Sequence, residues 1–140
     1  MDISKIEHVG LACHSLEKAT HFYSTVLGLP VVDEETLPEM KLRVCKVQVG
    51  ETVLELLEPM EGETIISKFL QDRGEGIHHL CFAVEDIRAS MKSLVSQGYH
   101  PLWEEPRIGA GGKWVNFLRP KETHGVLLEL NQDRESETPS

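Results

Sequence analysis

The sequence is poor in the features that mark several large classes of protein. It has only three cysteines, all within apolar runs, so we interpret them as reduced core residues of a cytoplasmic protein rather than a disulfide framework. It has no run of about 18 apolar residues, which argues against a membrane-spanning helix. Its N-terminus lacks a basic segment followed by an apolar one, so we expect no secretory signal.

Positive charge is also scarce, with 14 Lys and Arg against 23 Asp and Glu and a net charge of −9 at pH 7. This balance argues against a nucleic-acid partner, because nonspecific binding to nucleic acid requires a basic face. It does not exclude an anionic small molecule held by a local pocket of lysines and arginines. The length fits one compact domain, or two small half-domains that share a core.

One apolar stretch with a histidine near its start occurs twice in the chain. Residues 77–84 read Ile-His-His-Leu-Cys-Phe-Ala-Val, and residues 6–13 read Ile-Glu-His-Val-Gly-Leu-Ala-Cys. Aligning His8 with His79 also places Glu55 on Glu129, after a drift of three residues. A period this long is not that of a solenoid repeat. We therefore predict two βαβββ modules related by a pseudo-twofold axis, at about residues 4–60 and 76–132, with a linking helix at about 63–72.

The spacing of apolar residues predicts the elements of each module. In the first module we expect a helix at residues 16–27 and strands at 6–13, 30–34, 41–49 and 52–57, and the linking helix that follows is expected at residues 63–71. In the second we expect a helix at residues 87–97, and strands at 77–84, 101–104, 113–118 and 125–130. The glycine-rich segment 107–112 is predicted to be a loop, either a simple connection or a lid. Residues 133–140 are polar and are expected to fray.

Side-chain alternation along a strand selects one histidine in each copy of the repeat. His8 shares its strand face with a glycine and an alanine, which leaves room for a ligand. His79 lies on the corresponding face with a cysteine and an alanine, whereas His78 falls on the bulkier face expected to pack on a helix. The remaining histidines have no repeat partner and are interpreted as surface or loop residues: His14, His21, His100 and His124.

The repeat places one histidine and one carboxylate of each module at matching positions, His8 with Glu55 and His79 with Glu129. Each glutamate shares its strand face with apolar residues, where an uncompensated carboxylate is costly and a metal ion would remove that cost. A charge facing water or a histidine at a rim explains any one position, but four matched positions favour a metal site. Two imidazoles and two carboxylates suit a borderline divalent cation such as Co²⁺, Zn²⁺, Ni²⁺ or Mn²⁺.

The sequence resembles the vicinal oxygen chelate superfamily, the glyoxalase-like metalloenzymes, from about residue 5 to residue 132. Within it the chain is similar to the methylmalonyl-CoA epimerases. The segments that carry the resemblance are residues 6–10, 54–59, 76–80, 105–109, 116–121 and 125–130. The histidine and glutamate positions are shared by much of the superfamily. The Leu-Leu-Glu-Pro and Glu-Pro-Arg-Ile-Gly segments are more specific for the epimerase branch.

The resemblance implies an α+β fold of the glyoxalase/bleomycin resistance type. In this fold the two βαβββ modules pair into an open, cup-shaped mixed sheet, here a single domain over residues 1–140, usually as a homodimer. It implies a divalent metal, with Co²⁺ the first candidate, held by His8, Glu55, His79 and Glu129. The activity implied is interconversion of the (2R) and (2S) forms of methylmalonyl-CoA, an acyl-CoA substrate.

The chemistry implied is removal of the C2 proton, which lies between a thioester and a carboxylate. The product is an enolate that a metal stabilises, and inversion needs a base on one face and an acid on the other. Glu129 and Glu55 are the candidate acid and base, while Lys113 and Arg107 are candidate contacts to the CoA phosphates. Some members carry a carboxylate base in the strand at residues 42–47, and this chain has none there.

Two other functions remain open from the residues alone. One is a glyoxalase I-type lyase or isomerase that acts on a glutathione hemithioacetal with the same metal. The other is a non-catalytic, small-molecule-binding protein of this fold.

Overall fold

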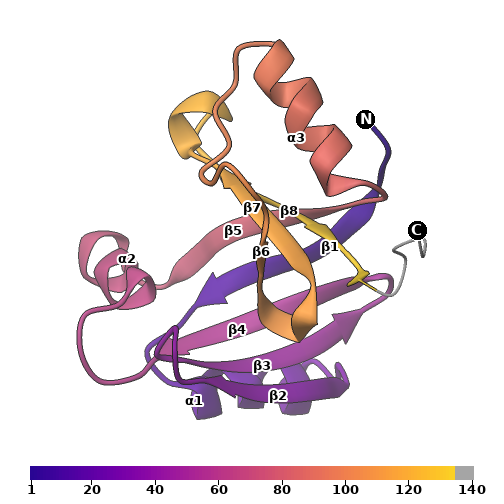
Figure 1. The fold of residues 1–140 in the computed structure, drawn as a ribbon. Coiled ribbons are helices and arrows are strands. Elements are labelled where there is room, and N and C mark those ends of the chain that lie inside the picture. Colours follow the sequence, from indigo (N-terminus) through magenta and orange to yellow (C-terminus); the bar gives the residue numbers. More distant parts are fainter. Residues whose placement is uncertain (135–140) are drawn as a thin grey trace. The chain divides into compact units, whose positions relative to one another are not determined.

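The computed structural model describes residues 1–134 (Figure 1). The chain divides into two units. Unit 2 is residues 8–78, and unit 1 combines residues 1–7 with the chain from residue 79 onward. Two strands, β1 (Ile3–Ala12) and β5 (Gly76–Val84), contribute residues to both units. The prediction of one domain built from two modules stays a prediction, and the expected fraying falls largely outside the described residues. Over those residues, no helix has the length and apolar character needed to cross a bilayer.

The sheet of unit 2 contains the end of β1 and three strands that follow one another in the chain. These are β2 (Val31–Leu37), β3 (Leu42–Val49) and β4 (Thr52–Pro59). The order is β2-β3-β4-β1, antiparallel except for the parallel pair of β4 with β1. Residues 50–51 form the turn between β3 and β4, and Gly50 adopts a φ of +60° that favours glycine there.

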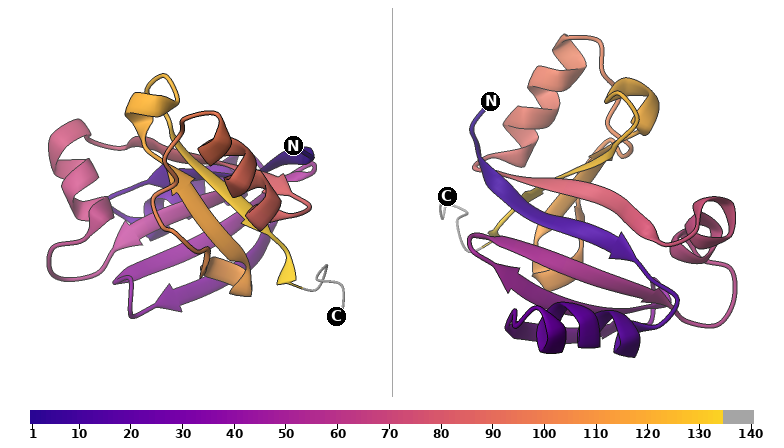
Figure 2. Two further views of the ribbon diagram at one scale, coloured as in Figure 1. Left: turned by 45° about the horizontal axis from the view of Figure 1, so that its top comes forward. Right: turned by 180° about the vertical axis from the view of Figure 1, so that it is seen from behind.

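The first helix differs from the continuous α-helix expected at residues 16–27. It begins as α1 (Leu16–Thr20) and continues as a π-helix, η1 (His21–Val26), in which the Leu27 amide donates to the Phe22 carbonyl. The wider turn rotates the apolar stripe, so only part of it faces the sheet. Leu16, Ala19 and Tyr23 pack on the buried core of the sheet, whereas Phe22, Val26 and Leu27 are about half exposed. Figure 2 shows this helical segment running along one face of the unit 2 strands.

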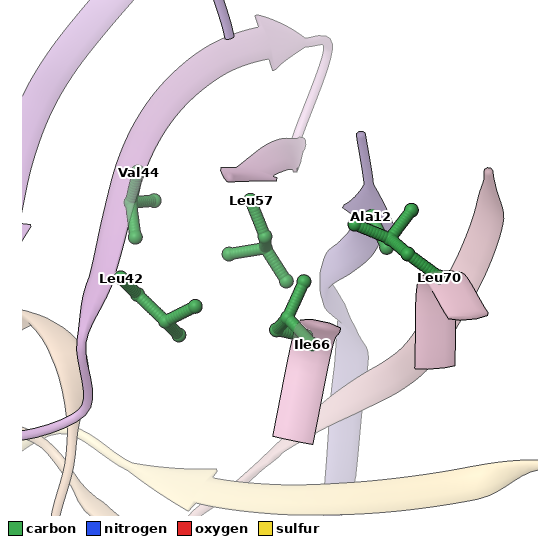
Figure 3. Packing of buried hydrophobic residues seen from close by; sticks show 6 residues of the cluster. All are labelled: Ala12, Leu42, Val44, Leu57, Ile66 and Leu70. Carbon is green, nitrogen blue, oxygen red and sulfur yellow. The ribbon is translucent and has the colours of Figure 1, made fainter. Parts of the chain in front are cut away.

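The opposite face of the unit 2 sheet is covered at one end by α2 (Ile65–Arg73). Thr64 and Ser67 form a capping box that begins this helix. The buried cluster on this face comprises Ala12, Leu42, Val44, Leu57, Ile66 and Leu70 (Figure 3). Ala12 lies on the same face of β1 as His8 and packs against α2. The space expected for a ligand beside His8 therefore does not extend to Ala12.

Unit 1 pairs the start of β1 with the strands of the second half of the chain. These are β5, β6 (Arg107–Ile108), β7 (Trp114–Leu118) and β8 (Leu127–Gln132), in the order β1-β5-β8-β7-β6. The helix α3 (Ile87–Ser96) is capped by Asp86, whose carboxylate accepts a hydrogen bond from the Ala89 backbone amide. Two short 3₁₀ turns, η2 (Ala110–Gly112) and η3 (Pro120–Glu122), complete the unit.

The strand expected at residues 101–104 does not form. The Leu102 amide donates to the Phe117 carbonyl at 2.8 Å, but the Trp103 amide donates to the Asn116 side chain at 3.1 Å. Prolines at 101 and 106 also remove backbone donors. The Asn116 side chain thus replaces a backbone ladder, and the short strand β6 forms inside the segment expected to be a loop.

Candidate functional site

The two histidine–glutamate pairs arise from the same strand register in the two units. In unit 2, β1 pairs in parallel with β4, so that Glu55 lies two positions beyond the residue opposite His8. In unit 1, β5 pairs in parallel with β8, and Glu129 lies two positions beyond the residue opposite His79. Because side chains alternate along a strand, each glutamate projects from the same face as its histidine.

Each pair is close and buried. The His8 Nδ1 atom lies 3.5 Å from the Glu55 Oε2 atom, and these side chains are 4% and 8% exposed. The His79 Nε2 atom lies 3.4 Å from the Glu129 Oε1 atom, with side-chain exposures of 9% and 10%. In each pair an imidazole nitrogen and a carboxylate oxygen thus lie within 3.5 Å of each other and are largely excluded from water. Each unit therefore supplies one nitrogen and one oxygen donor suited to a divalent metal.

Lys113 belongs to a polar network in unit 1. Its ammonium donates to Glu7 Oε1 at 2.9 Å, while the Asn131 amide donates to Glu7 Oε2 at 3.1 Å. Burial lowers the pKa of Lys113, but the hydrogen bond to Glu7 and the charges of Glu7 and Asp133 raise it more, so its pKa lies above the ordinary value. Lys113 is thus a charged group already engaged by a carboxylate.

Arg107 is held differently. Its guanidinium carbon lies 4.4 Å from the centre of the Trp103 ring, a cation–π contact, and Trp103 in turn meets Phe117 edge-on. Arg107 is exposed and its charge faces water. The two predicted substrate contacts, Lys113 and Arg107, therefore have separate anchors within unit 1.

The other histidines behave as the alternation of side chains predicts. His78 meets the Phe69 ring of α2 edge-on at 5.1 Å, and burial together with the nearby Arg73 charge lowers its pKa. It belongs to the helix-packed side, unlike His79. The four histidines without a repeat partner are exposed: His14, His21, His100 and His124.

Lys46 is not among the site residues predicted from the sequence. This residue lies opposite Glu55 in the antiparallel pair of β3 with β4, so both side chains project from one face of the sheet. Its ammonium is 3.3 Å from Glu35 Oε2 and 3.8 Å from Asp33 Oδ2, and its side chain is 15% exposed. The signal was available, because the turn at residues 50–51 fixes which residue of β3 faces Glu55.

Unit 2 also contains a cavity of about 850 Å³ between residues 39–42 and the start of α2. Its walls comprise residues 39–42, 63–68, 71 and 72. None of the histidines, glutamates or cations predicted as site residues contributes to these walls. We therefore do not assign it to the chemistry of the histidine–glutamate pairs.

Comparison with known proteins places this geometry in a family. Residues 7–117 match the model of the Glyoxalase/Bleomycin resistance protein/Dioxygenase superfamily. The chain is 41% identical over 132 residues to the mitochondrial methylmalonyl-CoA epimerase of Homo sapiens, covering 94% of this chain and 75% of that protein. It is 39% identical to the ethylmalonyl-CoA/methylmalonyl-CoA epimerase of Cereibacter sphaeroides, covering 93% of this chain and 98% of that protein.

A solved structure agrees with these relatives. A variant of the Streptomyces coelicolor methylmalonyl-CoA epimerase, in complex with 2-nitronate-propionyl-CoA, superposes with a TM-score of 0.90 at 34% identity. The match covers 99% of this chain and 100% of that one. The predicted α+β glyoxalase fold is confirmed, and the chain belongs to the glyoxalase superfamily and, within it, to the family of the methylmalonyl-CoA epimerases.

Proposed function

We propose that this chain interconverts the (2R) and (2S) forms of methylmalonyl-CoA by moving the proton at C2. The observation that carries the proposal is the matched pair of buried histidine–glutamate contacts, set by one register in both units. Membership of the epimerase family supplies the substrate class. We also propose that the protein is a homodimer and that it is located in the cytoplasm. Light scattering tests the oligomeric state.

We infer that His8, Glu55, His79 and Glu129 together hold one divalent cation. The donor set fits, because ligands bound to one ion at about 2.1 Å lie roughly 3 Å apart, close to the 3.5 Å and 3.4 Å measured within the pairs. Co²⁺ is our first candidate, and Zn²⁺, Ni²⁺ and Mn²⁺ share the same donor preference. When bound, such a cation supplies positive charge for the thioester oxygen and substrate carboxylate as the C2 proton leaves.

Glu129 and Glu55 are the proposed acid and base at C2. Inversion requires one group to take the proton from one face of the planar carbon and another to return a proton to the opposite face. The two carboxylates occupy equivalent positions in the two units, each within 3.5 Å of a histidine nitrogen. Lys113 and Arg107 remain our proposed contacts to the anionic CoA moiety. Arg107 is the more available of the two, since Glu7 engages Lys113.

The test is incubation of the metal-loaded protein with (2R)-methylmalonyl-CoA in D₂O, following deuterium at C2 and formation of the (2S) form. We expect metal-dependent conversion with deuterium entry. Replacement of Glu129 by Gln should lower turnover about a hundredfold or more with only a modest change in substrate binding. Glu61→Gln, at an exposed position, is the matched control.

Two results would contradict the proposal. If no divalent cation tested supports exchange at C2, the proposed epimerase activity is refuted. A hemithioacetal assay and a small-molecule binding assay would then test the two other functions. Unchanged turnover in the Glu129→Gln variant would remove that residue from proton transfer. Chelation followed by thermal unfolding tests the metal separately, because removal of a ligand bound to the native state lowers the unfolding midpoint.

A further inference from the structure

We propose that Lys46 is a substrate-binding residue that receives the free carboxylate of the acyl-CoA. The inference deepens the proposed function and rests on it for the identity of the substrate. Its starting point is position. Lys46 lies directly opposite Glu55 in the β3–β4 pair, where opposing side chains share a face with Cβ atoms about 4.5–5.5 Å apart. The lysine therefore projects from the same face of unit 2 as the His8–Glu55 pair.

The ammonium of Lys46 forms ion pairs with two carboxylates of β2 but donates a hydrogen bond to neither of them. Asp33 lies at 3.8 Å, beyond hydrogen-bond distance. Glu35 lies at 3.3 Å, but its buried Oε2 atom makes no hydrogen bond with any described residue. A largely buried ammonium that has ion-pair partners but donates no hydrogen bond to them can still gain one, and the substrate carboxylate would accept a charge-assisted hydrogen bond from it.

Unit 1 shows that the fold does not require a cation at this place. The register of β7 on β8 sets Phe117 opposite Glu129, in the position that Lys46 occupies opposite Glu55. Phe117 is packed edge-on against Trp103 there. The residue directly opposite the glutamate on the antiparallel neighbour is therefore a cation in unit 2 and an aromatic ring in unit 1. The difference is a charge added to one half of a repeated framework, as expected for a residue that distinguishes one end of a substrate from the other.

The substrate end that a lysine recognises is the carboxylate at C2. Methylmalonyl-CoA carries it, and propionyl-CoA has the same thioester and methyl group without it. Lys46 should therefore determine specificity for carboxylated acyl-CoAs. Loss of a hydrogen bond between charged groups corresponds to about a ten- to hundredfold loss in affinity. The loss should fall on methylmalonyl-CoA alone.

The experiment compares dissociation constants for methylmalonyl-CoA and propionyl-CoA by calorimetry, using the full-length, metal-loaded protein and its Lys46→Met and Lys46→Arg variants. In Lys46→Met we expect weaker binding of methylmalonyl-CoA, by about ten- to hundredfold, and unchanged binding of propionyl-CoA. Lys46→Arg should restore part of the preference. Lys18→Met, at an exposed position on α1, is the control. In turnover, the Lys46→Met variant should show a raised KM with kcat within a few-fold of the parent.

The simplest competing explanation is that Lys46 only offsets the acidic residues of β2. In that case Lys46→Met would change binding of both thioesters equally or not at all, and adding Glu35→Gln would restore the thermal midpoint. Either an equal change or no change in binding overturns the inference. Failure of the parent protein to epimerise overturns the proposed function instead, and the binding comparison still decides the role of Lys46.

Discussion

Replacing Lys113 by methionine removes an ammonium from a largely buried ion pair while keeping most of the aliphatic stem. The side chains of Lys113 and Glu7 are 29% and 14% exposed, and the Nζ–Oε1 distance is 2.9 Å. Breaking a fully buried pair costs about 3–5 kcal/mol, and an exposed pair contributes about 0–1 kcal/mol. For this intermediate pair we expect a loss of about 1–3 kcal/mol in the free energy of unfolding.

Urea denaturation measures this loss. With a slope of about 2 kcal/mol per molar, the midpoint should fall by about 0.5–1.5 M. The double variant Glu7→Gln/Lys113→Met removes the remaining charge and should recover part of the stability. If the double variant is as unstable as Lys113→Met, the carboxylate of Glu7 is not what the lysine stabilises.

The pH dependence gives a second check with a defined sign. Burial lowers the pKa of Lys113, but the hydrogen bond to Glu7 and the charges of Glu7, Asp133 and Cys81 together raise it more, so folding raises this pKa above its ordinary value of 10.5. A raised lysine pKa contributes stability that is fully present below the unfolded pKa and is lost as the pH rises through the folded one. The difference between the parent and Lys113→Met should therefore stay constant from about pH 6 to 9 and shrink above about 10.5. A difference that persists at higher pH would refute the reasoning.

Three further predictions concern stability and reactivity. A Cβ atom at Gly109 would lie 2.9 Å from both methyl carbons of Val115, so Gly109→Ala should cost about 1–3 kcal/mol on denaturation and a second change, Val115→Ala, should relieve it. Thr64→Ala removes the cap of α2 and should cost about 1 kcal/mol, whereas Thr64→Ser should cost little. Burial, with the nearby charges of Glu58 and Glu75, raises the pKa of Cys13 to about 11, so the native thiol should alkylate slowly at pH 8 until the protein is unfolded.

The histidine–glutamate pairs could be predicted because they follow from a repeat. The spacing between equivalent histidines differs from that between equivalent glutamates by three residues, yet the strand registers are the same. The three extra residues of the second half must therefore lie in the connections between its strands. Alternation along β5 then separates His79 from His78 with no knowledge of tertiary structure.

Other features depended on contacts that local patterns do not contain. Lys113 reaches Glu7 across 106 residues of sequence, and no spacing rule relates them. The side chain of Asn116 replaces a strand at residues 101–104 because a single amide supplies both a donor and an acceptor. The apolar spacing of residues 21–26 does not show whether they form an α-helix or a π-helix. The two differ in the backbone hydrogen bonds that the segment makes.

The division of β1 between the two units has a consequence for the order of events during synthesis. Residues 8–78 are all available to unit 2 once His78 has left the ribosome. The first seven residues must wait, because Glu7 and Ser4 bond to Asn131 and Ala83, which are made 124 and 79 residues later. Until then the beginning of the chain is an unsatisfied strand edge, able to pair with a neighbouring nascent chain. Contacts this distant in sequence generally form slowly, and the exposed strand edge favours aggregation while they are unmade.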